Sequence, residues 1–473
     1  MITSTDLNNL FEEIKGLYLS SDYPWVIGYS GGKDSSCTLQ LIWQAVSQIK
    51  SEDRKTPIFV IYSDTYVETP VISKYLETIT TKIQQAATEK NMPISVNGVF
   101  PEINNTFWVN LLGKGYPAPK TKFRWCTDRL KIEPANNFIK KQVSKYGEVI
   151  VVLGARKAES ASRAQVIEKK QRESGFRPAD LLTKHSVLPN AYVYTPIADF
   201  TTEDVWKYLL ANPNTPWLTH NRDLFKMYAD AQDGECPLVV DKTTPPCGTS
   251  RFGCWVCTLV EDDKSLRAMV SKGDIRFRPL LEYRKMLLET TLPENKAKYR
   301  SYKRRTGRVD FAGEEDQKII RGPYKMEYRK EFLKILLGIQ EDINKNENDH
   351  VKIIRDDEIK EIRRIWQAEE GDWEDSAAKI YKEVTGKDPN WLSDDSAQFG
   401  EKEMAILKKI CTEMKVPVEL VTRLIDKERE FNRLGRRTNL IKELDGILRE
   451  EWRTEEEVVK EHKEKRTLVH DYK

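Results

Sequence analysis

The sequence has no run of about 18 apolar residues, so it predicts no membrane-spanning helix. Its first residues, MITSTDLNNLFEE, are acidic and lack the apolar core of a secretory signal, which favours a cytoplasmic protein. No internal repeat is present, and the five histidines stand at no metal-ligand spacing. The net charge of +3 is too small to argue for or against a nucleic-acid partner.

Two common nucleotide-binding motifs are also missing, the Walker A loop G-x-x-x-x-G-K-[ST] and the dinucleotide fingerprint G-x-G-x-x-G. Instead, YSGGKDSS (29–36) stands between an apolar run, WVIGY (25–29), and an amphipathic helix predicted for 35–49. The glycine pair allows a tight turn, the amides at the helix start face an anion, and a lysine adds a cation. This pattern predicts a phosphate cradle formed by Ser30, Gly31, Gly32, Lys33, Asp34, Ser35 and Ser36.

Strand-like and helix-like segments alternate along the first half of the chain. Apolar runs predict strands at 25–29, 57–62, 94–99, 148–154 and 193–197, and helices are predicted at 35–49, 68–90 and 202–210. This alternation predicts an α/β fold with a doubly wound, mostly parallel sheet. Ligands of such sheets collect at the carboxyl ends of the strands, where Asp64 follows the second strand and Gly154 ends the fourth.

The segment GARKAESASR (154–163), at the end of the fourth strand, carries two arginines. Arg156 and Arg163 are seven residues apart, so on a helix they would share one face. That position suits a pyrophosphate leaving group, whose charge grows as the bond between the α- and β-phosphates breaks. We therefore expect both arginines to be catalytic, together with Lys33 and Asp34.

Between the third and fourth strands, residues 113–131 (GKGYPAPKTKFRWCTDRLK) interleave basic and aromatic side chains in a predicted loop. Two interpretations stay open: the loop holds nucleic acid, or it is a lid over ATP phosphates. Cys126 lies among cations that should lower its pKa, so it either carries a persulfide or packs beneath the lid. The residues expected to contact the substrate are Lys120, Lys122, Arg124, Arg129 and Lys131.

Four of the seven cysteines are crowded together, as Cys236, Cys247, Cys254 and Cys257. The spacing C-x10-C-x6-C-x2-C suggests metal ligation before disulfides in a cytosolic enzyme, because a C-x-x-C pair closes easily on one metal. Spacing does not separate structural zinc from a [4Fe–4S] cluster, since both accept four thiolates. The remaining cysteines of predicted helices, Cys37 and Cys411, are expected to pack in the core.

These motifs resemble a known family. S-G-G-K-D-S resembles the PP-loop of the N-type ATP pyrophosphatases. Further segments resemble its phosphoadenosine phosphosulfate (PAPS) reductase-like branch: the pattern of Cys126, Lys131 and Pro134, the segment 154–163, and TPI…TEDVW within 195–206. Within that branch, residues 107–119, 123–131 and 250–258 are similar to the DndC-type sulfurtransferases of bacterial DNA phosphorothioation. The likeness covers roughly residues 15–285.

The resemblance implies an adenine nucleotide alpha hydrolase-like fold that uses ATP with Mg²⁺. The cradle residues, Asp64, Gly154 and Arg156 would bind ATP, with Asp34 near the magnesium. The resemblance also favours a [4Fe–4S] cluster over zinc for the four cysteines. It implies DNA as substrate, a cysteine desulfurase as sulfur donor, and an ATPase and a DNA-binding protein as further partners. The expected reaction adenylylates a DNA phosphate, releases pyrophosphate and replaces a non-bridging oxygen by sulfur.

Three alternatives remain: a PAPS or adenylylsulfate reductase, a tRNA thiolase, and a non-catalytic DNA-binding scaffold. The expected domains are a PP-loop domain (1–235), a four-cysteine module (236–290) and a charged α-helical region (291–473). A basic linker, Lys296–Arg308, offers another surface for DNA, although a run of charges more often marks solvated surface.

Overall fold

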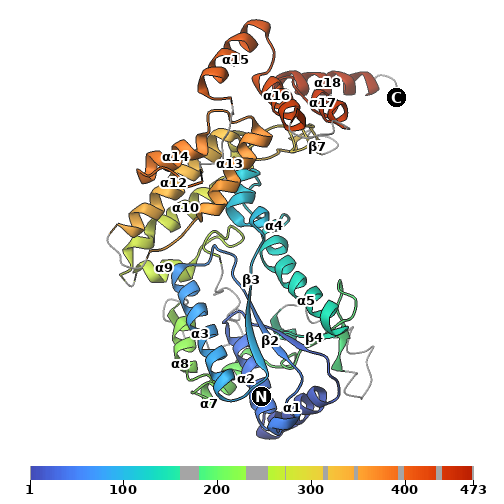
Figure 1. Ribbon diagram of the computed structural model, residues 1–473, viewed down its shortest axis with the longest axis vertical. Coiled ribbons are helices and arrows are strands. Elements are labelled where there is room, and N and C mark those ends of the chain that lie inside the picture. The colour runs from blue at the N-terminus through green and yellow to red at the C-terminus, as the bar shows by residue number, and fades with distance from the viewer. Residues whose placement is uncertain are drawn as a thin grey trace. The chain divides into compact units, whose positions relative to one another are not determined.

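The structure is a computed structural model that describes residues 2–159, 181–230, 254–271, 273–312, 318–345, 350–391, 399–432 and 439–470. The chain forms two compact units (Figure 1). Unit 1 comprises Met1–Glu102 and Arg124–Leu281, and unit 2 comprises Ile103–Phe123 and Glu282–Lys473. Across the described ranges, no helix has the length and apolar character needed to cross a membrane. The expected boundary at residue 235 lies outside the described residues and stays a prediction.

Unit 1 is built on a six-stranded sheet of order β3-β2-β1-β4-β6-β5. All neighbouring strands are parallel except β5 and β6, which confirms the doubly wound, mostly parallel α/β prediction. The edge strand β5 was not foreseen, because two residues are too short to form a periodic pattern. The strands are β1 (Trp25–Gly28), β2 (Ile58–Ser63), β3 (Ile94–Val99), β4 (Val149–Val152), β5 (Thr183–Lys184) and β6 (Ala191–Tyr194).

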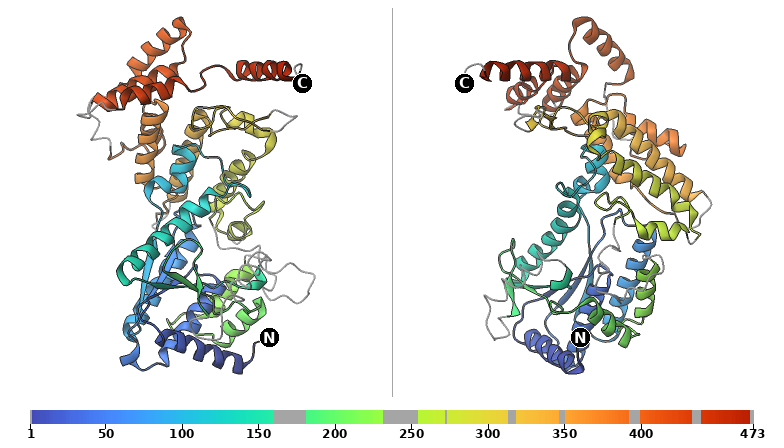
Figure 2. Two further views of the ribbon diagram at one scale, coloured as in Figure 1. Left: turned by 90° about the vertical axis from the view of Figure 1, so that its right-hand side faces the viewer. Right: turned by 180° about the vertical axis from the view of Figure 1, so that it is seen from behind.

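Helices cover both faces of this sheet (Figures 1 and 2). Residues alternate across the strands, so Val26 packs with Ile139 of α5 while its neighbours Trp25 and Ile27 face the other helices. Cys37 is fully buried on that second face, as expected. The helices of the second face are α1 (Ser4–Leu19), α2 (Lys33–Ser47), α3 (Pro70–Glu89), α7 (Thr202–Ala211) and α8 (Asn221–Asp230), opposite α5 (Glu133–Tyr146).

The loop expected at 113–131 is shorter than the sequence indicated. A π-helical turn, η3 (Val109–Gly113), precedes it, and helical structure resumes with α4 (Trp125–Thr127) and the π-helical turn η4 (Asp128–Ile132) before α5. The glycines and prolines that predicted a loop end at Pro119, and none follows until Pro134 at the start of α5. The prediction was therefore wrong for 125–131, where nothing interrupts helical backbone.

Unit 2 is mainly α-helical, as expected for the C-terminal region. The segment 103–123, inserted between β3 and α4, contributes to its core: Trp108 donates its indole N–H to the Ile353 carbonyl (2.8 Å), and Trp366 donates to the Leu112 carbonyl (2.8 Å). A short hairpin is formed by β7 (Phe311–Ala312) and β8 (Lys318–Ile319). The helices are α11 (Lys296–Tyr299), α12 (Met326–Asn344), α13 (Asp356–Glu370), α14 (Ser376–Thr385), α15 (Glu401–Met414), α16 (Val418–Asn432), α17 (Leu440–Leu448) and α18 (Glu455–His470). Two further helices are α9 (Lys264–Ser271), which belongs to unit 1, and α10 (Arg278–Glu289), within which the chain passes from unit 1 to unit 2.

Candidate functional site

The predicted phosphate cradle forms the turn from β1 into α2, at the point where the strand order reverses between β2 and β4. Gly31 has a φ of +73°, and a Cβ there would come within 2.6 Å of the Leu76 side chain, so the position requires glycine. The Ser35 hydroxyl accepts from the Ser30 amide at 3.2 Å and donates to the Gly32 carbonyl at 3.0 Å. The loop is therefore braced by its own serines, while the other cradle serine, Ser36, is buried in α2.

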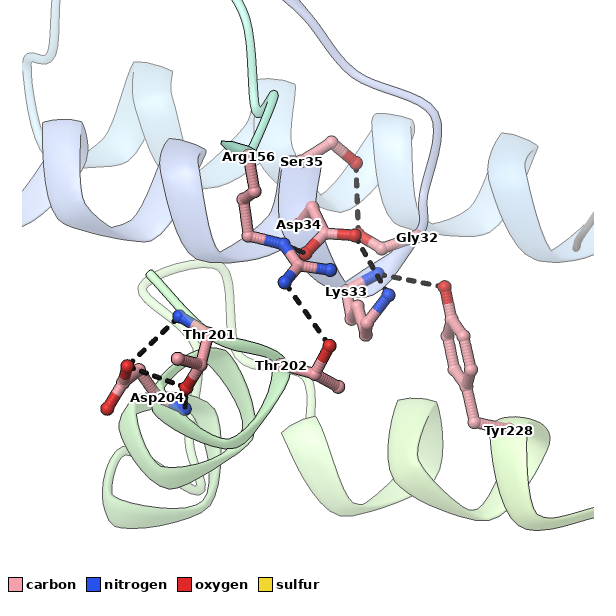
Figure 3. A network of polar contacts seen from close by, with 9 residues as sticks. All are labelled: Gly32, Lys33, Asp34, Ser35, Arg156, Thr201, Thr202, Asp204 and Tyr228. Atoms are coloured by element: carbon pink, nitrogen blue, oxygen red, sulfur yellow. Dashed lines mark hydrogen bonds and ion pairs between the residues drawn. The ribbon is translucent and has the colours of Figure 1, made fainter. Parts of the chain in front are cut away.

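The charged residues of the cradle form one connected group (Figure 3). Asp34 contacts the Lys33 ammonium through Oδ2 at 2.9 Å and the Arg156 guanidinium Nε through Oδ1 at 2.7 Å. The side chains of Lys33, Asp34 and Arg156 are 9%, 17% and 4% exposed. Gly154 permits this approach, because a Cβ there would lie 2.9 Å from the Asp34 carbonyl group. Two cations thus share one carboxylate, which leaves net positive charge where phosphates are expected.

Two further elements support the cradle, a role that the sequence did not indicate for either of them. Arg156 also donates to the Thr202 hydroxyl (3.2 Å) at the start of α7, whose capping box joins Thr201 and Asp204 (Figure 3). From α8, the Tyr228 hydroxyl accepts the Lys33 backbone N–H at 3.2 Å, and the Lys33 ammonium lies 5.4 Å from the Tyr228 ring centroid. Tyr228 therefore occupies one of the amides that would otherwise face an anion.

A second cluster of reactive side chains lies at the end of β2. Cys254 lies 3.3 Å from the Thr65 hydroxyl, and a backbone bond of 3.0 Å from Trp255 to Val67 holds this turn against the segment after β2. The Cys257 amide donates to the Cys254 carbonyl at 3.0 Å, which closes the C-x-x-C turn. Asp64 belongs to the same segment: it accepts from the Tyr66 amide at 2.8 Å.

The electrostatics of this thiol cluster correct one expectation. We expected neighbouring cations to lower the pKa of Cys126, but loss of hydration and the nearby Cys257 raise it, and Lys131 offsets this only in part. Loss of hydration likewise raises the pKa of Cys254 to about 12, again opposed by Lys131. The thiols in turn, Cys254 most strongly, raise the pKa of Lys131. Loss of hydration and the charge of Asp64 raise the pKa of Glu68.

The thiols of Cys126, Cys254 and Cys257 and the ammonium of Lys131 therefore lie close together, although Cys126 and Cys257 are far apart in the sequence. Thiolates are soft donors that suit zinc or an iron–sulfur cluster, and Lys131 supplies a compensating positive charge. The described residues contain no set of three or more His, Cys, Asp or Glu side chains already arranged around a metal. The other predicted ligands, Cys236 and Cys247, lie outside the described residues, as does Arg163.

The five predicted substrate contacts are divided between the two units. Arg124, Arg129 and Lys131 belong to unit 1, and Lys131 interacts with the thiol cluster there. Lys120 and Lys122 belong to unit 2, at a tight turn of the segment 103–123.

About half of the chain matches a known protein family. The phosphoadenosine phosphosulfate reductase domain matches residues 24–260. An uncharacterized protein of Methanocaldococcus jannaschii is 28% identical over 202 residues, which cover 42% of this chain and 33% of that protein. A second uncharacterized protein of that organism is 26% identical over 193 residues, which cover 41% of this chain and 37% of that protein. The chain thus spans about a third of the length of these curated relatives.

Similarity to solved structures is slight. A phosphoadenylyl-sulfate reductase from Candida auris, in a phosphate complex, has 13% identity and a TM-score of 0.28, covering 47% of this chain and 92% of that one. A U34-tRNA thiolase from Methanococcus maripaludis, determined with its [4Fe–4S] cluster, has 12% identity and a TM-score of 0.28, covering 60% of this chain and 78% of that one. At these scores neither structure bears on the function of this chain.

Proposed function

This chain belongs to the phosphoadenosine phosphosulfate reductase domain family, and from that premise we propose that it is a cytoplasmic ATP-dependent sulfurtransferase of DNA backbone phosphorothioation. The observation that carries the proposal is the group of Lys33, Asp34 and Arg156 at the N-terminus of α2. Buried cations beside free helix amides bind phosphates, and the family acts on adenine nucleotides in sulfur chemistry. ATP with Mg²⁺ is the proposed cosubstrate.

The first proposed step activates DNA. A non-bridging oxygen of a DNA phosphate attacks the α-phosphorus of ATP, the bond to the β-phosphate oxygen breaks, and pyrophosphate leaves. Lys33 and Arg156 would stabilise the charge that grows on the leaving group. Asp34 pairs with Lys33 and Arg156 when no nucleotide is bound. Phosphates of a bound nucleotide would replace the Asp34 carboxylate as the partner of these two cations. Its carboxylate would then be available to Mg²⁺, which prefers oxygen ligands.

The second proposed step transfers sulfur. A sulfur nucleophile attacks the activated DNA phosphorus, and the bond to the AMP oxygen breaks, so that AMP is released. Cys126 is the proposed sulfur carrier, because it lies within electrostatic reach of Cys257 and Lys131 in unit 1. As a persulfide it would attack through its outer sulfur, and an external dithiol reductant would then break the S–S bond, which leaves sulfur on the DNA phosphorus and regenerates the Cys126 thiol. Lys131 would offset the negative charge of the thiolates before and after transfer.

The cysteine set also suits an iron–sulfur cluster, which we include in the proposal. Cys254 and Cys257 are held on one closed turn, and the sequence supplies Cys236 and Cys247 as further thiols. A bound [4Fe–4S] cluster would supply iron sites able to hold sulfide near the activated phosphate. A cysteine desulfurase as sulfur source, and an ATPase and a DNA-binding protein as partners, complete the proposal.

The reductase alternative is less well supported by the cysteines. Such an enzyme needs a reactive cysteine after the C-x-x-C pair, and the sequence has only Cys411 there. Cys411 lies in α15 and is 3% exposed, so its thiol is packed within unit 2 and is poorly accessible to a reactant. A tRNA thiolase would use the same two steps on another nucleic acid, and the experiment below separates the two substrates.

The test has two measurements. Pyrophosphate release is followed with Mg²⁺-ATP and DNA or tRNA for the parent protein and for Lys33→Ala, which should be inactive but folded. DNA from cells with and without the gene is digested and searched by mass spectrometry for phosphorothioate dinucleotides. Phosphorothioate only in cells that carry the protein supports the proposal. Pyrophosphate release that depends on tRNA, with unmodified DNA, would replace it by the thiolase alternative.

A further inference from the structure

Unit 2 contains a group of cations that is separate from the ATP cradle. Residues 120–123 form a tight turn in which Lys120 and Phe123 exchange backbone hydrogen bonds of 2.7 and 3.2 Å. The buried Tyr324 fixes the base of this turn, because its hydroxyl accepts the Ala118 amide at 3.0 Å and also bonds the Thr290 hydroxyl. The Lys120 ammonium donates to the Thr291 carbonyl at 3.4 Å, so it is held beside the chain that leads into α11.

Two cations of the following segment face Lys120. Loss of hydration, together with the positive charges of Lys296 and Arg300, lowers the pKa of Lys120 to about 8. Arg300 is fixed in place by donating to the carbonyls of Gly322 (2.7 Å) and Arg321. Three positive charges from two segments of unit 2 therefore lie near one another, and those of Lys296 and Arg300 repel the Lys120 ammonium.

No carboxylate balances this group within the described part of unit 2, where Lys120 and Arg300 donate only to backbone carbonyls. The rest of the basic linker behaves differently. Three of its cations form ion pairs with carboxylates: Lys303 with Glu419 (3.5 Å), Arg304 with Asp310 (3.5 Å) and Arg305 with Glu369 (2.5 Å). Within the described residues, the linker thus leaves Lys296 and Arg300 without an acidic partner, whereas Lys303, Arg304 and Arg305 are each paired with a carboxylate. Like charges held together without an acid are typical of an anion site.

We propose that Lys120, Lys296 and Arg300 bind a phosphate of a single-stranded nucleic-acid backbone. A second feature favours a polynucleotide over free phosphate: Phe123, at the other end of the turn, is 42% exposed and lies 6.4 Å from the Tyr116 ring. An exposed aromatic ring beside a phosphate site allows a base to stack while its backbone is neutralised. That the strand is DNA rests on the proposed function, but the site itself is formed by unit 2 alone.

The test uses the full chain and a fluorescein-labelled single-stranded DNA oligonucleotide, titrated across a salt series. Lys120→Ala and Lys296→Ala should each reduce the slope of log K against log salt by about 0.7, the value for one phosphate contact with a single strand. Lys298→Ala is the matched control. It removes the same charge from α11, but its ammonium lies over the Tyr299 ring (4.9 Å), so the slope should not change.

Inorganic phosphate serves as the second probe. If phosphate alone stabilises the parent but not Lys120→Ala, and neither variant alters the DNA slope, the occupant is free phosphate and the nucleic-acid proposal is wrong. Equal slopes for the parent and both variants, without any effect of phosphate, would overturn the site itself. Pyrophosphate release by the parent is measured in parallel. Its absence, together with altered slopes, would refute the proposed reaction while supporting this site.

Discussion

Replacing Asp34 by Asn tests the charge balance of the cradle directly. The carboxylate contacts Lys33 and Arg156 at 2.9 and 2.7 Å, and all three side chains are less than a fifth exposed. Asparagine keeps the shape and one acceptor oxygen but removes the negative charge, so both cations lose their balancing partner. We expect the variant to be less stable without ligand, to bind pyrophosphate more tightly and to lose Mg²⁺-ATP turnover.

The expected loss in the free energy of unfolding follows from the contacts of Asp34 with Lys33 and Arg156. Hydrogen bonds to charged groups are worth about 1.5–3 kcal/mol each, and the amide oxygen can retain the one from Arg156 in weaker form. A loss of about 2–3 kcal/mol is therefore expected, which corresponds to about 4–12 °C in the melting temperature of a unit of this size. Pyrophosphate at about 100 times its Kd should restore about 2.7 kcal/mol, because it binds the folded cradle.

The assay is thermal unfolding with and without pyrophosphate, in the absence of Mg²⁺. Asp199→Asn is the control. Its carboxylate pairs with Lys157 at 2.5 Å, but its side chain is 73% exposed. An exposed pair is worth about 0–1 kcal/mol, so the control should melt close to the parent and respond to pyrophosphate as the parent does. An Asp34→Asn variant as stable as the parent, or one that pyrophosphate stabilises no more than the parent, would refute the reasoning.

Three further predictions concern other residues. Tyr228→Phe frees the Lys33 amide and should lower the KM for ATP in the pyrophosphate assay; an unchanged KM would mean that Tyr228 does not compete with phosphate. Protein purified without oxygen should be brown and contain about four irons, and Cys254→Ser should lose them; one zinc in a colourless parent would contradict the cluster. Because the pKa of Lys120 is lowered to about 8, it loses its proton as pH rises from 7 to 9, and oligonucleotide affinity should fall over that range. Lys120→Ala should flatten this profile, because it removes the group that titrates over this range.

The sheet and the cradle could be predicted because local patterns determine both. A run such as VIVV in β4 is buried on both faces, so its apolar character identifies a strand without knowledge of its neighbours. The cradle is likewise continuous in sequence, from Ser30 to Ser36. Its glycine pair indicates a tight turn, and its lysine indicates a cation beside that turn. Arg156 could be placed near it because the ends of parallel strands meet at one edge of the sheet.

The remaining features depend on contacts between distant residues. Tyr228 reaches Lys33 from 195 positions away, and no local pattern distinguishes it from any other buried tyrosine. The effect of burial on Cys126 was missed because the sequence shows its cations but not the protein atoms that replace water around it. The segment 103–123 was expected in the first domain, with a loop only from residue 113, although its residues FWVNLL (107–112) are apolar enough to join the core of unit 2.

The cradle follows β1, and the segment that contacts Cys254 follows the adjacent strand β2. Because β1 and β2 pair in parallel, with Gly28 opposite Ile61, the cradle and this segment leave the sheet at the same edge. Neighbouring strands are about 4.8 Å apart, and α3, which begins just after Glu68, places Leu76 against Gly31. Any displacement of this helix would therefore alter the cradle and the thiol cluster together. The proposed reaction must bring a nucleotide and a sulfur carrier together, and this arrangement would favour it because elements of one sheet position the two groups.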